Sequence, residues 1–460
     1  MHPRVAVLAF VSLLPAAAPA ADPVDAAAAK EITATEAKKV GMLLAGPKFL
    51  GRGTGQKGND DAALWLAGQL REAGFDAGPA PGGGADGKLD DADFLQKFTA
   101  TRGGGGGGAP TQNVVGVLRG TGRARGAVAT GGEPPPPGEA APVPPEGPEA
   151  VVLGAHFDHL GVQGKHDPKK PPKKSGVFWG ADDNASGTTG TLLAARALGR
   201  LHREGVRTRR SVVVCFFSGE EVGLLGSKHY VGNPVVPLAD TVAMVNLDMV
   251  GRNATNQMEV YGNTSSPELD AWHQAVLEET KFKCAYPSPE LLMRSDQWSF
   301  YEAGIPVLFL HGGLHKDYHT VRDVPEALNY AKVALVARHA FEVVWLAAED
   351  PKRPSFRKID MKGAGGALGL AVDPCTPEEE EPLDLDAGQS AVKVTAVFAG
   401  GLGEKFFEVG DLVYLWNGFP LAEDDPVARW GAFVQAARKG DRVTIRYVRG
   451  KERKAALVQF

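Results

Sequence analysis

Residues 150–161 read AVVLGAHFDHLG, an apolar run that closes on polar residues. A continuous β-branched and apolar run of this length is typical of a strand buried on both faces of a parallel sheet. The run ends at His156, and in such sheets ligands gather outside the carboxyl ends of the strands. The stretch therefore predicts an α/β fold with a site near His156.

Strand and helix patterns alternate on both sides of this stretch. SGTTGTLLAARALGRL predicts a helix, and further strands are predicted by SVVVCFFS, TVAMVNLDMV and IPVLFLH, and upstream by NVVGVLRG. Helices between such strands cover both faces of the sheet. Earlier in the chain, residues 59–73 have helical spacing, with Asn59 as the expected N-cap and Gly74 as the stop.

The N-terminus predicts an exported protein. Arg4 precedes the apolar residues 5–14, and the small-residue stretch AAAPAA follows. This order predicts a secretory signal peptide over residues 1–21, with an uncleaved anchor as the alternative, and hence a periplasmic or extracellular location. No later run reaches the roughly 18 apolar residues of a spanning helix, so no transmembrane span is predicted. The net charge of -5 gives no indication of a nucleic-acid partner.

Composition divides the rest of the chain into two domains. The first is predicted over residues 27–350, with low-complexity insertions near residues 103–108, 132–149 and 165–175 that cannot pack a core. The basic insertion 165–175 is either a solvated loop or a segment that steers acidic substrates. Residues 351–362 are polar and contain prolines, which indicates a linker, and residues 363–460 predict a small, mostly β domain.

Residues able to hold metal ions recur in five segments of the first domain. They are His156, Asp183, the pair Glu220 and Glu221, Asp248 and His319. Imidazole nitrogens and carboxylate oxygens are zinc ligands. Burying so many polar groups near strand ends is costly without a common partner, which disfavours a purely structural interpretation.

Two features of this set predict a pair of metal ions. One carboxylate can bridge two cations about 3.5 to 4 Å apart, and Asp183 is the candidate, with Asp182 as its competitor. Glu220 and Glu221 are adjacent, so on an extended backbone they cannot both enter one metal shell. We therefore expect one to bind metal and the other to act as a general base on water.

Two further aspartates are candidates for supporting roles. Asp158 lies two residues after His156 and is expected to accept the other ring N–H of that histidine, or else to cap a loop. Asp323 begins the sequence DVPE, which resembles a helix N-cap followed by its partner glutamate.

As an ordered set, these motifs resemble the co-catalytic dizinc aminopeptidases. The family includes secreted bacterial leucine aminopeptidases and, more distantly, glutamate carboxypeptidase and the transferrin receptor. The resemblance runs from FLGRGTG at Phe49 to about Ala348 and rests on GAHFDHLG, GADDNASG, SGEEVGLLGS, VNLDMVG, SDQWSFYEAGIP and YHTVRD.

The resemblance implies a three-layer α/β/α sandwich with a mostly parallel central sheet, and a cofactor of two Zn²⁺ ions. It implies that His156 and Asp248 hold one zinc, that Glu221 and His319 hold the other, and that Asp183 bridges them. Glu220 matches the general base, with Asp158 beside it in the catalytic set. The implied reaction removes N-terminal residues from peptides or proteins.

The resemblance also implies a substrate pocket. Met249 and Tyr318 match positions that line the side-chain pocket in relatives, and Asp296 is counted with them. Many members have Ser-Asp-His where this chain has Ser295, Asp296 and Gln297. The substitution puts any role of that histidine in doubt.

The C-terminal domain resembles a PDZ domain. Residues 367–370, ALGL, stand where such domains have their carboxylate-binding loop, and VGDLVYLWNG and GDRVTIRYVRG match later strands. An extended peptide is the expected ligand, added to a sheet edge through main-chain hydrogen bonds.

Two other functions compete with the aminopeptidase. A glutaminyl cyclase shares the sandwich but generally works with one zinc, and some relatives without metals act as receptor-like binding proteins. Neither H-E-x-x-H nor G-x-S-x-G occurs in the chain, so a helix-borne zinc site and a serine nucleophile elbow are disfavoured.

Overall fold

The computed structural model describes most of the chain. The described residues are 23–80, 88–101, 108–122, 149–164, 176–253, 255–280, 282–286, 289–359, 366–385, 389–422, 426–437 and 440–460. The predicted signal peptide, nearly all of the glycine-rich and proline-rich insertions, the basic insertion and the end of the predicted linker lie outside the described residues.

The centre of the first domain is a mixed, mostly parallel sheet. β4 (Ala150–His156) lies between β7 (Ser211–Phe217) and β8 (Thr241–Asp248) and is parallel to both. β11 (Val307–His311) continues the sheet parallel to β8. All residues of these four strands are buried, which is why their sequences are continuously apolar. The predicted fold class is confirmed here.

The strands that flank the four central ones run in the opposite direction. β3 (Ala109–Leu118) is antiparallel to β7, and β9 (Gln257–Tyr261) is antiparallel to β11. β1 (Asp76–Ala77) and β2 (Leu95–Ala100) pair with β3, and β10 (Lys283–Ala285) pairs with β9. The order is β1-β3-β7-β4-β8-β11-β9-β10, with β2 also on β3.

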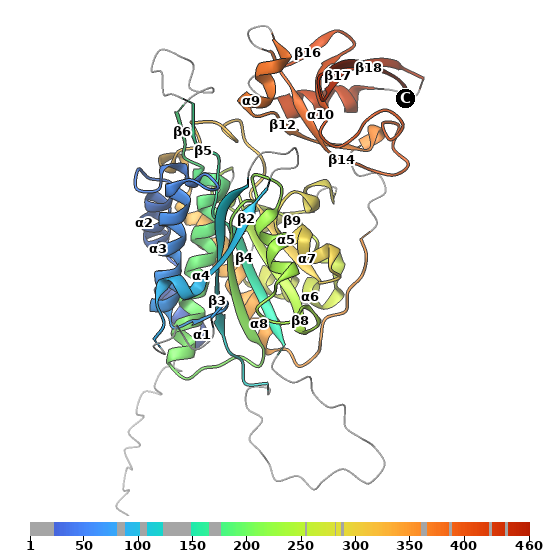
Figure 1. Cartoon of the computed structure of the whole chain (residues 1–460). Coiled ribbons are helices and arrows are strands. Elements are labelled where there is room, and N and C mark those ends of the chain that lie inside the picture. Colours follow the sequence, from blue (N-terminus) through green and yellow to red (C-terminus); the bar gives the residue numbers. More distant parts are fainter. Residues whose placement is uncertain are drawn as a thin grey trace, which may run out of the picture.

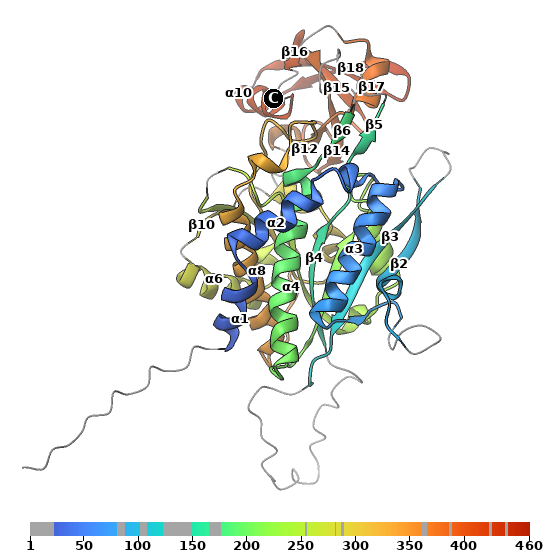
Figure 2. The same ribbon diagram turned by 90° about the vertical axis from the view of Figure 1, so that its left-hand side faces the viewer.

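Helices cover both faces of the sheet. One face carries α1 (Pro23–Glu31), α2 (Ala34–Leu44), α3 (Lys57–Ala73), α4 (Gly187–Arg203), α6 (Pro267–Thr280) and α8 (Tyr330–Glu349). Figure 2 shows α1 to α4 toward the viewer. The other face carries α5 (Leu225–Gly232) and α7 (Gln297–Glu302), which pack Tyr230 and Phe300 on the sheet.

The predicted helix at residues 59–73 begins earlier than expected. α3 starts at Lys57 and ends at Ala73, and Gly74 follows as its C-cap with φ 89°. Asn59 is not the N-cap. Its side chain is buried in the first turn, where it donates to the backbone oxygen of Arg52 and to the hydroxyl of Ser218.

Residues beyond 366 form a separate antiparallel unit. Its strands are β12 (Leu370–Pro374), β13 (Gln389–Ser390), β14 (Val392–Val397), β15 (Leu412–Trp416), β16 (Phe419–Ala422), β17 (Arg442–Arg449) and β18 (Glu452–Gln459), and its helices are α9 (Pro377–Glu380) and α10 (Pro426–Ala436). Leu370, Val392, Trp416 and Ile445 belong to its own core.

The C-terminal unit lies over one end of the central sheet. Figures 1 and 2 show it above the end toward which the hairpin of β5 (Gly161–Gln163) and β6 (Gly176–Phe178) projects. Arg294 of the first domain pairs with Asp373 and donates to the backbone oxygen of Val372. Within the described residues, no helix is both long and apolar enough to cross a membrane.

Candidate metal centre

Three central strands deliver the first candidate residues to one edge of the sheet. His156 ends β4 and Asp248 ends β8, while Glu220 and Glu221 follow β7 after a two-residue turn. Parallel strands have their carboxyl ends at the same edge, so these side chains meet although more than sixty residues separate β4 from Glu220 and Glu221.

Asp183 reaches the same edge on the turn before α4. The carboxylate of Asp323 accepts the backbone N–H of Asp182, at 3.0 and 2.9 Å, and that of Asp183, at 3.0 Å. Asp323 is therefore not the helix cap that its sequence suggested, since the following short helix has Val324 at its N-cap without a side-chain bond. It fixes the backbone that presents Asp183.

Small polar residues tie this turn to the strand ends. The Asn184 side chain donates to the backbone oxygen of Leu247 at 3.0 Å and accepts the N–H of Met249 at 3.2 Å. The Ser186 hydroxyl oxygen accepts the N–H of Val250 at 2.9 Å, and Thr188 donates to the backbone oxygen of His156 at 2.7 Å. These buried bonds hold the turn against β8 and β4.

The structure gathers possible metal ligands into two groups. One contains His156, Asp183 and Asp248, and the other contains His159, Asp183, Glu221 and His319, with the ligand atoms of each group within 4.8 Å of one another. Asp183 belongs to both groups, which is the placement expected of a bridging carboxylate. All five predicted ligands are thus brought together, and His159 joins them.

The separations within the two groups suit ligands around a common ion. His156 Nε2 lies 3.3 Å from Asp183 Oδ1 and 3.3 Å from Asp248 Oδ1. His319 Nε2 lies 3.0 Å from Asp183 Oδ2 and 3.1 Å from Glu221 Oε2. Zinc bonds of about 2.0 to 2.2 Å in a tetrahedral arrangement place neighbouring ligand atoms roughly 3.3 Å apart.

Buried atoms in both groups lack hydrogen-bond partners among the described residues. Asp183 Oδ2, Asp248 Oδ1 and His319 Nε2 each lie close to other ligand atoms of their group, and the fourth such atom is His159 Nε2, whose ring contacts the group through Nδ1 instead. Buried polar atoms are normally paired because an unpaired one loses its solvation without compensation. A cation between the oxygen and nitrogen lone pairs would satisfy them, so the residues fit a metal centre.

Asp182 points away from these groups. Its Oδ1 accepts the N–H of Gly251 at 2.6 Å, and its Oδ2 lies 3.1 Å from His315 Nε2. Of the two candidates for the bridge, only Asp183 therefore has both oxygens in the cluster.

Asp158 supports the loop more than the histidine ring. His156 Nδ1 lies 3.2 Å from the backbone oxygen of Asp158 and 3.7 Å from its carboxylate Oδ1, so the expected carboxylate contact is the longer one. The carboxylate accepts the Thr54 hydroxyl at 2.7 Å and the Glu220 N–H at 3.2 Å. Asp158 thus joins the segment of Glu220 to the strand end of His156.

Glu220 belongs to neither ligand group, but charged residues of the groups influence its pKa. Burial raises its pKa well above the usual range; His156 opposes the rise, and Glu221, Asp296 and Asp248 add to it. Burial likewise raises the pKa of Asp296 to about 7. A glutamate with a raised pKa is suited to accept and return a proton near neutral pH.

The predicted pocket residues border the centre. Tyr318 stacks on His319 with ring centroids 3.8 Å apart, and burial together with Asp183 and Glu221 holds its pKa well above the usual range. Met249 is buried directly after Asp248 and has a φ of 52°. Asp296 is buried, and neither of its carboxylate oxygens has a hydrogen-bond partner among the described residues.

Sequence reasoning missed two residues of this region, His159 and Arg52. His159 was visible as the second histidine of GAHFDHLG, but its spacing from His156 fits no strand periodicity. Arg52 is buried and donates to the backbone oxygens of Leu44, Phe157 and Gly180, at 2.6, 2.7 and 2.7 Å. It clamps the loop of His156 and His159 to the turn before Asp183.

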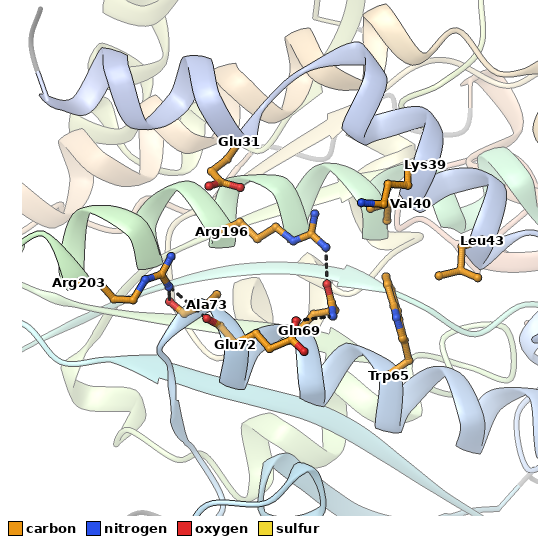
Figure 3. Close-up of a pocket in the computed structure, with 10 residues that line it drawn as sticks. All are labelled: Glu31, Lys39, Val40, Leu43, Trp65, Gln69, Glu72, Ala73, Arg196 and Arg203. Atoms are coloured by element: carbon orange, nitrogen blue, oxygen red, sulfur yellow. Dashed lines mark hydrogen bonds between the residues drawn. The ribbon is translucent and has the colours of Figure 1, made fainter.

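A separate cavity of about 470 Å³ lies between the helices α2, α3 and α4 (Figure 3). Its cationic side chains already have partners, since Arg196 donates to Gln69 and contacts Glu36, and Arg203 donates to the backbone oxygen of Ala73. No residue of the metal groups lines it. The cavity is therefore distinct from the candidate centre.

The two ligand groups at the edge of an α/β sheet fit a metal centre, and the comparisons show which proteins the chain resembles. Residues 140–344 match the profile of peptidase family M28. This stretch of the chain is therefore similar to peptidase family M28.

Related sequences agree with this assignment. Aminopeptidase YwaD of Bacillus subtilis is 30% identical over 227 residues, which are 47% of this chain and 45% of that protein. A probable leucine aminopeptidase of Trichophyton verrucosum is 32% identical over 213 residues, 45% of this chain and 56% of that protein. The chain thus spans about half the length of the curated relatives it matches.

Solved structures share the fold. The LapA aminopeptidase of Legionella pneumophila gives a TM-score of 0.50 at 19% identity, covering 72% of this chain and 75% of that chain. A glutaminyl cyclase of Porphyromonas gingivalis also gives 0.50, at 21% identity, covering 68% of this chain and 97% of that one. Because both activities occur on this fold, the fold alone does not choose between them.

Proposed function

We propose that this protein is a zinc-dependent aminopeptidase that binds two Zn²⁺ ions and removes N-terminal residues from peptides or proteins. The observation that carries the proposal is the position of Asp183 in both ligand groups. A carboxylate shared in this way holds two ions, whereas a one-metal cyclase needs no bridge. The similarity to aminopeptidases in sequence supports the same conclusion.

The residues divide the work as follows. His156, Asp183 and Asp248 hold one ion, and Glu221 and His319 hold the second together with Asp183. When bound, the ions supply Lewis-acid polarisation of the scissile carbonyl and lower the pKa of water. Glu220 takes the proton of the attacking water and delivers it to the leaving amine. Tyr318, Met249 and Asp296 line the substrate side of the centre.

Paired substitutions at the adjacent glutamates test this division. Glu220→Gln is expected to keep two zinc ions per chain while kcat on aminoacyl anilides falls by about two to four orders of magnitude. Glu221→Gln, the same change one residue on, is expected to lose metal. Zinc analysis and anilide hydrolysis measure both, and near-normal turnover by Glu220→Gln would refute the base assignment.

The same assays decide between the competing functions. The wild-type protein is expected to hydrolyse aminoacyl anilides and to leave N-terminal glutaminyl peptides uncyclised. One zinc per chain with cyclisation and no hydrolysis would establish the cyclase instead. Protein that binds no zinc and turns over neither substrate would be a binding protein.

We also propose that the C-terminal unit is a PDZ-like domain that binds extended peptides. β12 pairs with β14, stands at the end of the strand order of its sheet and contacts α10, and a sheet edge is where an extended peptide adds as a strand. Peptides with a free C-terminal carboxylate are expected to bind, and amidated copies of the same peptides to bind more weakly. Equal binding of both forms would contradict a carboxylate-binding loop.

Export to the periplasm or the medium is proposed from the N-terminal sequence. N-terminal sequencing of protein from cell fractions is expected to find a mature chain that begins near Asp22. Protein that is retained in the cytoplasm with Met1 intact would contradict it.

A further inference from the structure

One side chain in the centre is left without a role by the ligand set that the motifs imply. His159 lies three residues after His156, is buried, and belongs to the group of Asp183, Glu221 and His319. We propose that His159 is a fourth protein ligand, through Nδ1, of the metal ion held by Glu221 and His319. The inference rests on the proposed two-zinc function and adds a residue to one of its two sites.

The distances place His159 Nδ1 beside the carboxylates of this site. Nδ1 lies 2.6 Å from Glu221 Oε1 and 3.4 Å from Asp183 Oδ2. His319 Nε2 approaches the same two carboxylates, at 3.1 and 3.0 Å. Two imidazoles thus face one pair of carboxylates. Three of the four separations are near the roughly 3.3 Å between ligand atoms of a tetrahedral zinc, and the hydrogen-bonded contact of His159 Nδ1 with Glu221 Oε1 is shorter.

The His159 ring is held in this orientation by its surroundings. Its backbone N–H donates to the oxygen of Arg52 at 3.3 Å. Behind the ring is Gly180, where a Cβ atom would lie 2.4 Å from His159 Cγ. His159 and His319 meet edge to face, with centroids 5.7 Å apart. The ring is thus packed closely against the turn that carries Asp183.

A hydrogen bond from Nδ1–H to Glu221 is the competing interpretation. It explains the 2.6 Å contact but leaves the approach of the same nitrogen to Asp183 unexplained. His159 Nε2 is buried without a partner among the described residues in either case, so it does not favour one interpretation. The convergence of Nδ1 and His319 Nε2 on shared carboxylates favours the metal.

The two ion sites then differ in kind. Four protein ligands are typical of a closed structural zinc site, whereas three protein ligands leave a position open for water or substrate. A bound ion would have four protein ligands at the site of His159, Asp183, Glu221 and His319, and three at the site of His156, Asp183 and Asp248.

A crystal structure of the zinc-loaded full chain tests the ligand directly. Anomalous scattering locates both ions, and His159 Nδ1 is expected about 2.0 to 2.1 Å from the ion beside Glu221 and His319. A separation above about 3 Å, with a water in the fourth position, would overturn the proposal.

Zinc affinity of the full-length His159→Gln variant gives an independent test without activity. Loss of a residue that only hydrogen-bonds to a ligand weakens metal binding by about 10- to 100-fold. We expect more than about 100-fold weakening at one of two sites in chelator competition, with the other site unchanged. A smaller effect, or no effect, would make His159 a positioning residue at most and overturn the proposal.

Two matched substitutions accompany this variant. His319→Gln removes a ligand of the same site and is expected to weaken the same ion. His339→Gln removes a buried imidazole from α8, outside both groups, and is expected to leave both affinities unchanged. If the wild-type chain binds two zinc ions but His159→Gln matches His339→Gln, this inference fails while the proposed function stands.

Discussion

At the residue scale, the neighbouring aspartates of GADDNASG show how the backbone assigns roles to identical side chains. Both carboxylates are buried, but Asp182 accepts a backbone N–H from Gly251, and Asp183 turns into the cluster of histidines. Burial disfavours the charge on Asp183, and His159 together with His156 and His319 outweighs that effect and holds its pKa well below the usual range. The surroundings therefore keep Asp183 ionised for a metal.

Arg52 gives a prediction about stability at this scale. Its guanidinium donates to the backbone oxygens of Leu44, Phe157 and Gly180 and, at 3.1 Å, of Trp179. Arg52→Met would leave these buried oxygens without a donor, each at roughly 1 to 3 kcal/mol. We expect the free energy of unfolding of the metal-free protein to fall by about 3 kcal/mol or more in urea denaturation.

Arg71→Met is the matched control for this substitution. Arg71 is exposed and paired with Asp91 at 2.8 Å, and exposed pairs contribute about 0 to 1 kcal/mol. Equal effects of the two substitutions would show that the carbonyl clamp of Arg52 adds nothing to stability.

At the scale of elements, α6 and α8 meet through a pair of buried histidines. His273 Nδ1 lies 2.8 Å from His339 Nε2, and His273 Nε2 lies 3.2 Å from the Tyr286 hydroxyl. Burial lowers the pKa of His273 to about 4, against a small opposing effect of Asp270, and burial with His273 lowers the pKa of His339 to about 3. Both rings are therefore neutral in the folded protein above pH 5.

This pair predicts loss of stability in acid. The unfolded chain takes up protons at these histidines below its ordinary pKa of about 6.5, and the folded chain does not, so stability falls as pH drops from about 6.5 toward 4. Between pH 6.5 and 5 we expect a loss of about 1 to 2 kcal/mol per histidine. Urea denaturation of the metal-free protein at the two pH values measures it.

A His273→Leu, His339→Leu double variant is the comparison. It is expected to lack this part of the pH dependence while keeping the contribution of every other titrating group. The same slope in both proteins would show that the pair titrates normally in the folded state.

At the scale of the whole molecule, the C-terminal unit and the first domain are joined by side chains as well as by the chain itself. Residues that follow α8 are fastened to the first domain, since Arg353 pairs with Glu149 at 2.7 Å and the N–H of Ile359 donates to the Tyr301 hydroxyl at 2.6 Å. Arg294, next to Ser295 and Asp296, reaches across to Asp373 at the end of β12. The contact links the strand of the proposed peptide site to the edge of the metal centre.

Charge reversal at this contact is expected to separate the two units. Asp373→Lys places two cations together, and small-angle scattering should show a larger radius of gyration. Arg294→Asp combined with Asp373→Lys restores opposite charges and should return the wild-type value, while Asp384→Lys, an exposed aspartate of the same unit, should change nothing. An unchanged radius in Asp373→Lys would show that this pair does not hold the units together.

Much of this architecture can be predicted from the sequence because it follows from the local pattern of apolar and polar residues. The runs that form β4, β7, β8 and β11 are mostly apolar, so they predict buried parallel strands and, with them, the edge at which polar residues collect. The ordered motifs add the residue types of a zinc site. The prediction that Asn59 caps a helix is wrong because asparagine serves equally as an N-cap and as a buried side chain, and here its side chain is buried and bonded to Ser218.

Only the tertiary structure decided the directions in which the side chains of the site point. Whether Asp182 or Asp183 faces the cluster is set by hydrogen bonds that Asp323 accepts and Gly251 donates, and no local pattern encodes these residues far along the chain. The place of His159 beside Glu221 follows from the packing of Arg52 and Gly180 around its loop. The sequence by itself determines which histidines and carboxylates are present and which strand each of them follows. Only the tertiary structure determines the directions in which these side chains point, because a metal site is built from side chains that converge from distant parts of the chain.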